Sequence, residues 1–275
     1  RIKNDDFKVD LRRLSLRCSS FTLDKLALRA HITPMSLSVE DMVVKLPGTE
    51  IRPSDFVLEY NGYADLPQCL RRGSHELVMV DNELDPSDFM AFVPELGNFP
   101  GRYLLSLDAS GNAEALHVEK FRLKNSKGEF DFSFDADVSG LAGGDDIDIR
   151  LGNLGLSTTS RFLTENIGKV AEIPQTARRW IDAAGNIDLS VESTASIARD
   201  GRKVEGLAGN ASVTLSSSLA SMSADMEGRW KSGNMYEGRV DVRCPEIDLS
   251  AALPDAGIGA ASLELAGEFA GRGKD

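Results

Sequence analysis

The side chains that most often carry catalysis or bind metals are scattered along this chain. Three histidines, His31, His75 and His117, each stand alone, with no second histidine at ligand spacing. A zinc site needs several closely spaced His and Cys ligands, so we predict no metal centre. The cysteines are equally dispersed: Cys18, Cys69 and Cys244 form no Cys-x-x-Cys pair. This odd, sparse count argues against a disulfide framework.

Glycine-rich segments fall short of the motifs that bind nucleotides. Residues 257–262 match a dinucleotide fingerprint at all but one of its glycines, since Ser262 stands where the last glycine is required. They also follow Pro254 and Asp255 rather than a hydrophobic strand. Residues 267–274 have five residues between the outer glycines where a P-loop has four, and Asp275 replaces the required Ser or Thr. The Gly-x-Ser-x-Gly elbow of hydrolases is missing too. We therefore predict that the chain is not an enzyme and uses no cofactor.

The carboxylates alternate with apolar residues along the chain. Phe130, Phe132 and Phe134 occupy every second position, with acidic or hydroxyl side chains between them. Successive side chains of a strand point to opposite faces, so the three rings share one face and the polar side chains face water. The same alternation returns at 146–151, 186–191 and 239–243. A glycosidase needs two carboxylates across a cleft, whereas this pattern favours a solvated acidic face.

Strand patterns recur at short spacing along most of the chain. We predict strands near 11–17, 22–30, 36–46, 50–60, 75–80, 103–109, 116–124, 129–138, 145–151, 187–197, 207–215, 218–230, 235–244 and 262–269. Turn residues such as Pro34 and Pro47-Gly48 separate them. Strands without interleaved helices indicate an antiparallel meander rather than parallel βαβ units.

Two interruptions of the strand pattern are predicted to be helical. The first lies near 86–96, with Asp85 as its cap, Pro86 at its first position and Pro94 limiting its length. The second, at 158–184, is predicted to hold two helices separated by Pro174. The first helix would carry an apolar stripe at i, i+3, i+4 and i+7, formed by Phe89, Phe92, Val93 and Leu96.

These interruptions indicate a repeat. Segments that start at residues 84, 156 and 247 each show a strand end, a capping residue and a short amphipathic helix. Their irregular spacing favours a repeated supersecondary unit with variable loops, and three unrelated capped helices are the alternative. We divide the chain into a strand meander at 1–83, repeat units at 84–155 and 156–246, and the start of a third unit at 247–275.

A sheet with one apolar face must cover that face with a second sheet, by closure into a barrel, with helices, or with a ligand. The predicted helices are too few and short, because about fourteen strands at 4.8 Å each would extend roughly 60–70 Å. We therefore predict a mostly β fold: an elongated, curled antiparallel sheet that forms a U-shaped hydrophobic groove, with a few short helices. Acyl chains suit such a lining. The stripe of the first helix would cover the groove.

The charge and the aromatic content of the chain disfavour some classes of binding partner. The 275 residues are 41% hydrophobic and carry a net charge of −12, which disfavours nucleic acid and anionic headgroups. Phe, which suits contacts without water, outnumbers Tyr and Trp by 12 to 4 and 2. The chain has no starting Met and no apolar run that would span a membrane, so we expect a piece cut from inside a longer protein.

The segment Ser36-Leu-Ser-Val-Glu-Asp-Met-Val-Val-Lys-Leu-Pro-Gly48, the segment 88–96 and the strand-rich pattern resemble the AsmA-like/TamB proteins of the Gram-negative envelope. The resemblance covers nearly the whole chain and is strongest to TamB-type chains of Bacteroidetes. It implies a periplasmic β-groove in a long protein anchored in the inner membrane. Such proteins move phospholipid between membranes and are linked to outer-membrane assembly. The implied partners are phospholipid or another acyl-chain lipid, neighbouring segments of the same chain, and an outer-membrane assembly protein.

Strand faces predict which side chains would line the groove. They are Leu26, Leu28, Val39, Phe130, Phe132, Phe134, Ile147, Ile149, Ile187 and Leu189. A self-packed structural or adhesin module of the envelope, without a lipid ligand, is the alternative function. A third, a carbohydrate-active or carbohydrate-binding β-sandwich, is disfavoured because few Trp and Tyr rings are present for sugars to stack on.

Overall fold

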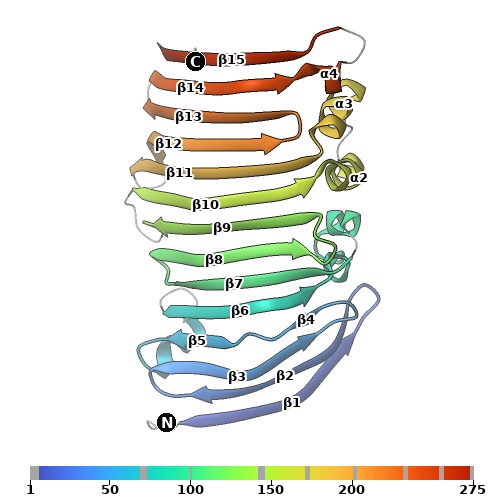
Figure 1. Cartoon of the computed structure of the whole chain (residues 1–275). Coiled ribbons are helices and arrows are strands. Elements are labelled where there is room, and N and C mark those ends of the chain that lie inside the picture. Colours follow the sequence, from blue (N-terminus) through green and yellow to red (C-terminus); the bar gives the residue numbers. More distant parts are fainter. Residues whose placement is uncertain are drawn as a thin grey trace. The chain divides into compact units, whose positions relative to one another are not determined.

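A computed structural model describes residues 6–68, 73–99, 101–141, 146–170, 174–200, 203–231, 235–253 and 257–272. Cys69 lies outside these residues. The chain forms two compact units, Arg1–Gly128 and Glu129–Asp275. Each is an antiparallel sheet with few helical residues, so the predicted mostly β class is confirmed (Figure 1).

Unit 1 is a meander of antiparallel strands. It contains β1 (Phe7–Arg17), β2 (Thr22–Ile32), β3 (Ser36–Lys45), β4 (Glu50–Ile51), β5 (Asp55–Glu59), β6 (Ser74–Leu84), β7 (Tyr103–Gly111) and β8 (Ala115–Asn125), with 3-10 helices η1 (Tyr63–Gln68), η2 (Pro86–Phe89) and η3 (Pro94–Asn98). Both β4 and β5 pair with β3 and β6. The single strand predicted at 50–60 is therefore wrong: Pro53, which has no N–H for the ladder, lies between two short strands.

Unit 2 has longer strands, and its strand order follows the chain. It contains β9 (Phe130–Ser139), β10 (Ile147–Thr159), α2 (Ser160–Val170), α3 (Gln175–Ala184), β11 (Asn186–Asp200), β12 (Lys203–Ser217), β13 (Ala220–Lys231), β14 (Met235–Asp248), α4 (Leu249–Ala252) and β15 (Ala260–Arg272). The two helices predicted on either side of Pro174 are confirmed, with Pro174 at the N-cap of α3. β10 continues well past residue 151, where the predicted strand ends.

Three β-bulges keep the apolar side chains on one face where strict alternation would not. Asp41, Asp81 and Asn153 have positive φ angles of 51°, 47° and 31°, which Asp and Asn tolerate better than most residues. At each site the register shows one extra residue, in β3, β6 and β10 respectively. An extra residue reverses the parity of the strand beyond it.

The helix predicted at 86–96 is corrected by the structure. Asp85 caps the segment as expected, since its Oδ1 accepts a hydrogen bond from the Ser87 N–H at 3.0 Å, and Pro86 lies in the first turn. The segment then forms two separate 3-10 helices, η2 and η3, instead of one amphipathic helix. Pro94 begins η3, and a proline inside an α-helix would have removed a hydrogen bond.

Apart from η1, which follows β5, the helical segments of the described residues follow β6, β10 and β14, at a spacing of four strands (Figure 1). In unit 2 these segments meet at one end of the strands, where α3 contacts α4. Ala184 at the end of α3 accepts a hydrogen bond from the Ser218 N–H at 2.9 Å, and Leu219 accepts one from the Asp248 N–H at 2.8 Å. The proposed division at residues 84, 156 and 247 remains a prediction.

Candidate functional site

In unit 1, the predicted lining residues are half-buried side chains of one sheet face. Leu26 pairs with Leu14 and Val44, while Val39 pairs with Ala30 on the same side of the sheet. Val39 and Val44 are an odd number of residues apart, so in a regular strand they would point to opposite faces. The bulge at Asp41 adds one residue and brings both side chains to the same face. Leu28, opposite Leu11 in β1, is half-buried as well.

In unit 2, the predicted lining residues fall into rows that cross the sheet. Directly opposed residues of antiparallel strands share a face, and one such row runs Phe132, Leu156, Leu189, Leu215, Met222. A parallel row begins with Phe130 and reaches Ile187, and others contain Ile149 and Ile147. The rings of Phe132 and Phe134 lie 5.8 Å apart between centroids. All seven predicted side chains of this unit are half-buried.

The same face continues into β12–β15, beyond the residues that the sequence singled out. Here we find Leu207, Met226, Leu265 and Phe269, with exposed fractions of 46%, 43%, 51% and 51%. Val240 and Val242 lie on this face too, opposite Met226 and Leu265, and their alternation with charged residues could have indicated them from the sequence alone. We call the whole surface the apolar face of unit 2. Its rows of opposed residues pass through these positions of β9 and β10–β11: Phe132, Leu154, Leu151, Ile187, Ile149 and Ile147.

A hollow of about 700 Å³ lies in this face, across β11–β14. Its floor is a row of glycines, because Gly209, Gly228 and Gly238 are directly opposed in three adjacent strands. The hollow, which we call the glycine hollow, is bounded on one side by Leu207, Trp230 and Tyr236 and on the other by Ala211, Met226 and Val240. Its volume falls within the range of small-molecule sites.

Phe269 covers one end of the glycine hollow. It is directly opposite Gly238, and its Cζ lies 2.5 Å from where a Cβ on Gly238 would be. An aromatic ring packed over a cross-strand glycine is a known way to support a sheet at a residue without a side chain. At the other end the row continues to Ala195, whose small side chain leaves the floor open.

Little of the protein covers the apolar face of unit 2. The principal contacts of each strand are with its neighbours in the sheet, and the helices contact the sheet chiefly where α2 meets β10 and α4 meets β15. Phe162 of α2 stacks on Phe130 at 5.1 Å between centroids, so this helix does reach the margin of the face. In the described residues, the middle of the face carries no second layer of protein.

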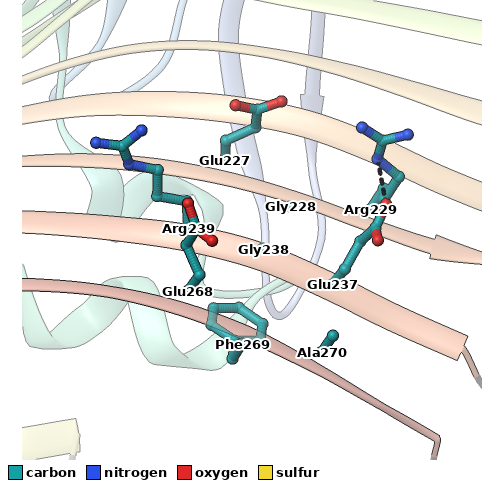
Figure 2. A pocket seen from close by; sticks show the side chains of 9 residues that line it. All are labelled: Glu227, Gly228, Arg229, Glu237, Gly238, Arg239, Glu268, Phe269 and Ala270. Carbon is teal, nitrogen blue, oxygen red and sulfur yellow. Dashed lines mark ion pairs between the residues drawn. The ribbon is translucent and has the colours of Figure 1, made fainter.

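The opposite face of unit 2 is charged. A hollow of about 500 Å³ lies above Gly228 and Gly238. Figure 2 shows side chains that line it, among them Glu227, Arg239, Glu268 and the ion pair of Arg229 with Glu237. The Arg229 Nε and Glu237 Oε1 are 2.8 Å apart, but both side chains are more than half exposed. Exposed pairs of this kind add little stability. Around this hollow both signs of charge are interleaved, so the hollow itself is not a single-sign binding site.

Of the four side chains predicted to cover the groove in unit 1, two are exposed and two are half-buried. Phe92 is 68% exposed and Val93 45%, whereas Phe89 and Leu96 are half-buried. Phe92 makes one edge-on aromatic contact, with Phe21, at 5.4 Å between ring centroids. These four residues do not form one stripe, since the segment is not a single helix.

The described residues hold no group of three or more His, Cys, Asp and Glu side chains that would bind a metal ion. Within the same residues, no helix has both the length and the apolar character needed to cross a bilayer. Comparisons with known proteins give no match: no family model, curated protein or solved structure matches the chain.

Proposed function

We propose that this chain is a non-enzymatic segment of a lipid-transfer protein, and that its apolar sheet face carries phospholipid acyl chains. The observation that carries the proposal is the apolar face of unit 2, which spans its strands and has large side chains half exposed. Each methylene group moved from water to an apolar surface gains about 0.8 kcal/mol. An acyl chain is therefore a favourable cover for a face that the described residues leave open.

The location follows from the resemblance to AsmA-like/TamB proteins. We propose that the segment works in the periplasm, inside a longer chain anchored in the inner membrane, and passes lipid towards the outer membrane. Neighbouring segments of that chain would continue the groove, and an outer-membrane assembly protein is the further proposed partner. The charged opposite face supports this placement, because it keeps the rest of the sheet in water.

Photocrosslinking in a Gram-negative host tests the proposal. A benzoyl-phenylalanine replaces Leu189, which is half-buried on the apolar face, and a control variant carries it at Ser190, which is exposed on the other face. After irradiation, mass spectrometry of the purified protein should find phospholipid attached at Leu189 and none at Ser190. Absence of lipid at both positions, with protein that is folded by circular dichroism, would favour the self-packed envelope module instead.

A second pair of probes addresses the segment that was predicted to cover the groove. Probes at Phe92 and at Leu28 compare a mostly exposed side chain with a half-buried one on the sheet face. Lipid captured from both positions would place the η2–η3 segment beside the bound lipid. Lipid captured from Leu28 alone would limit that segment to a structural role.

A further inference from the structure

The glycine hollow differs from the rest of the apolar face because its floor has no side chains. Three glycines in register are costly in a sheet, since each lacks a side chain for packing and loses more backbone freedom on folding. The floor consists of Gly209, Gly228 and Gly238, and the distance from Ala195 at its open end to Gly238 is roughly 14 Å at the usual spacing of strands. The hollow is thus a short trench that runs across the strands.

Backbone crowding explains two of these glycines but not the third. A Cβ on Gly209 would lie 2.6 Å from the Thr194 carbonyl oxygen, and one on Gly238 would lie 2.7 Å from the Glu227 carbonyl oxygen. A Cβ on Gly228 would meet nothing closer than the Glu237 carbonyl oxygen at 3.8 Å. Gly228 therefore has room for a side chain, and the space above it is open.

We propose that the glycine hollow is a seat for one extended acyl chain, with Phe269 as its end stop. The inference rests on the proposed function and adds a defined position at which a chain would pause. The side chains that border the trench on this face are uncharged, so it matches hydrocarbon and not a headgroup. The row of opposed residues that forms the floor continues through Ala195 to Ile149. This continuity gives an acyl chain a path along the apolar face.

Tryptophan fluorescence tests the seat directly, because the chain has only two tryptophans and one of them, Trp230, borders the hollow. Replacing the other, Trp180 of α3, by Phe leaves Trp230 as the sole reporter. The probe is 9,10-dibromostearate, whose bromine atoms quench a tryptophan that they contact. We expect this probe to quench Trp230 with a saturable concentration dependence.

The blocking variant is Gly228→Phe, which fills the trench from the one glycine that has room for a side chain. It should weaken quenching of Trp230 about tenfold in apparent affinity, as expected when about two methylene groups lose an apolar contact. The smaller Gly228→Val should weaken it less and guards against misfolding of the Phe variant. The matched control, Ser221→Phe, adds the same ring to the same strand on the other face and should leave quenching unchanged.

A second reporter separates the seat from the wider function. Leu189→Trp, in a background with Trp180→Phe and Trp230→Phe, reports on the apolar face away from the hollow. Suppose that the probe quenches this reporter and that, in a separate variant, Gly228→Phe leaves quenching of Trp230 unchanged. That result would contradict the proposed acyl-chain seat while still supporting the proposed function. Failure of the probe to quench either reporter in folded protein would overturn both.

Discussion

Thr49 and Asp85 are joined by hydrogen bonds although 36 residues separate them. The Thr49 hydroxyl accepts a hydrogen bond from the Asp85 N–H at 2.9 Å, and Thr49 is only 2% exposed. Beside it, the Gly48 N–H donates to Asp88 Oδ2 at 2.9 Å. These hydrogen bonds connect the turn after β3 to the start of η2. They give the Pro47-Gly48 turn a specific tertiary contact.

Thr49→Val should lower the free energy of unfolding by about 1–3 kcal/mol, because the shape is kept while the partly buried Asp85 N–H loses its acceptor, the buried Thr49 hydroxyl. Urea unfolding followed by circular dichroism measures the change. Thr214→Val, at an exposed position of β12, is the matched control and should change stability little. Equal stability of the two variants would show that the Asp85 N–H finds another partner.

Asp85→Ala should cost about 0.5–2 kcal/mol, the usual effect of losing an N-cap side chain. Asp248 caps α4 with the same geometry, since its Oδ1 accepts from the Ser250 N–H at 3.0 Å, but it is exposed. Asp248→Ala should therefore cost less than Asp85→Ala, and Asp85→Asn should retain most of the stability. The order of the three melting temperatures checks the prediction, and it fails if Asp248→Ala is the most damaging.

The interactions of Glu50 with Arg52 and Lys45 should make the free energy of unfolding decrease at acid pH. The Arg52 guanidinium, which hydrogen-bonds the carboxylate, and then Lys45, whose Nζ is 3.2 Å from Oε2, hold the pKa of Glu50 below its ordinary value of 4.5. A carboxylate with a lowered folded-state pKa stabilises above its unfolded pKa, and this contribution disappears as pH falls through the folded pKa. Glu50→Gln should therefore melt below wild type at pH 7, by a small margin that closes in acid.

Melting curves recorded from pH 7 to below pH 4 test the Glu50 prediction, with Glu119→Gln at an exposed position of β8 as the control. NMR titration of Glu50 gives its pKa directly. A pKa at or above 4.5 would contradict the ion-pair argument.

Phe132→Asp should separate an open lining from a self-packed core. Phe132 is half-buried between Phe134 and the opposed Leu156, so a carboxylate there would keep partial access to water. We expect the variant to fold and to capture less lipid from a probe at Leu189. Ser133→Asp, on the other face, should leave capture unchanged. A loss of several kcal/mol in Phe132→Asp would instead indicate burial of an unpaired charge in a closed core.

Much of this fold could be predicted from local pattern. Alternation at 130–138 identified a strand and its apolar side, and Asp85 and Pro174 were placed correctly at helix boundaries. These features depend on residues next to one another in the chain, which is why a single sequence reveals them. The single helix predicted at 86–96 was wrong, because the i, i+3, i+4, i+7 spacing of apolar residues occurs there in two short 3-10 helices and not in one α-helix.

The glycine hollow could not be predicted, because it exists only once the strands are in register. Gly209, Gly228 and Gly238 come from three strands, and nothing in the spacing of the letters shows that they oppose one another. The bulges at Asp41 and Asn153 were hidden for a similar reason. Each reverses the apparent parity of its strand, so counting by twos past residue 153 assigns the wrong face.

The four strands from β11 to β14 separate the connection that holds α2 and α3 from the connection that holds α4. Each antiparallel strand reverses the direction of the chain, and an even number of reversals returns it to the same side. Adding or removing one hairpin would keep both helical connections at the same margin of the sheet, whereas adding one strand would move the second connection to the opposite margin. The hairpin is therefore the smallest increment by which a sheet of this kind can change length and keep its helices together.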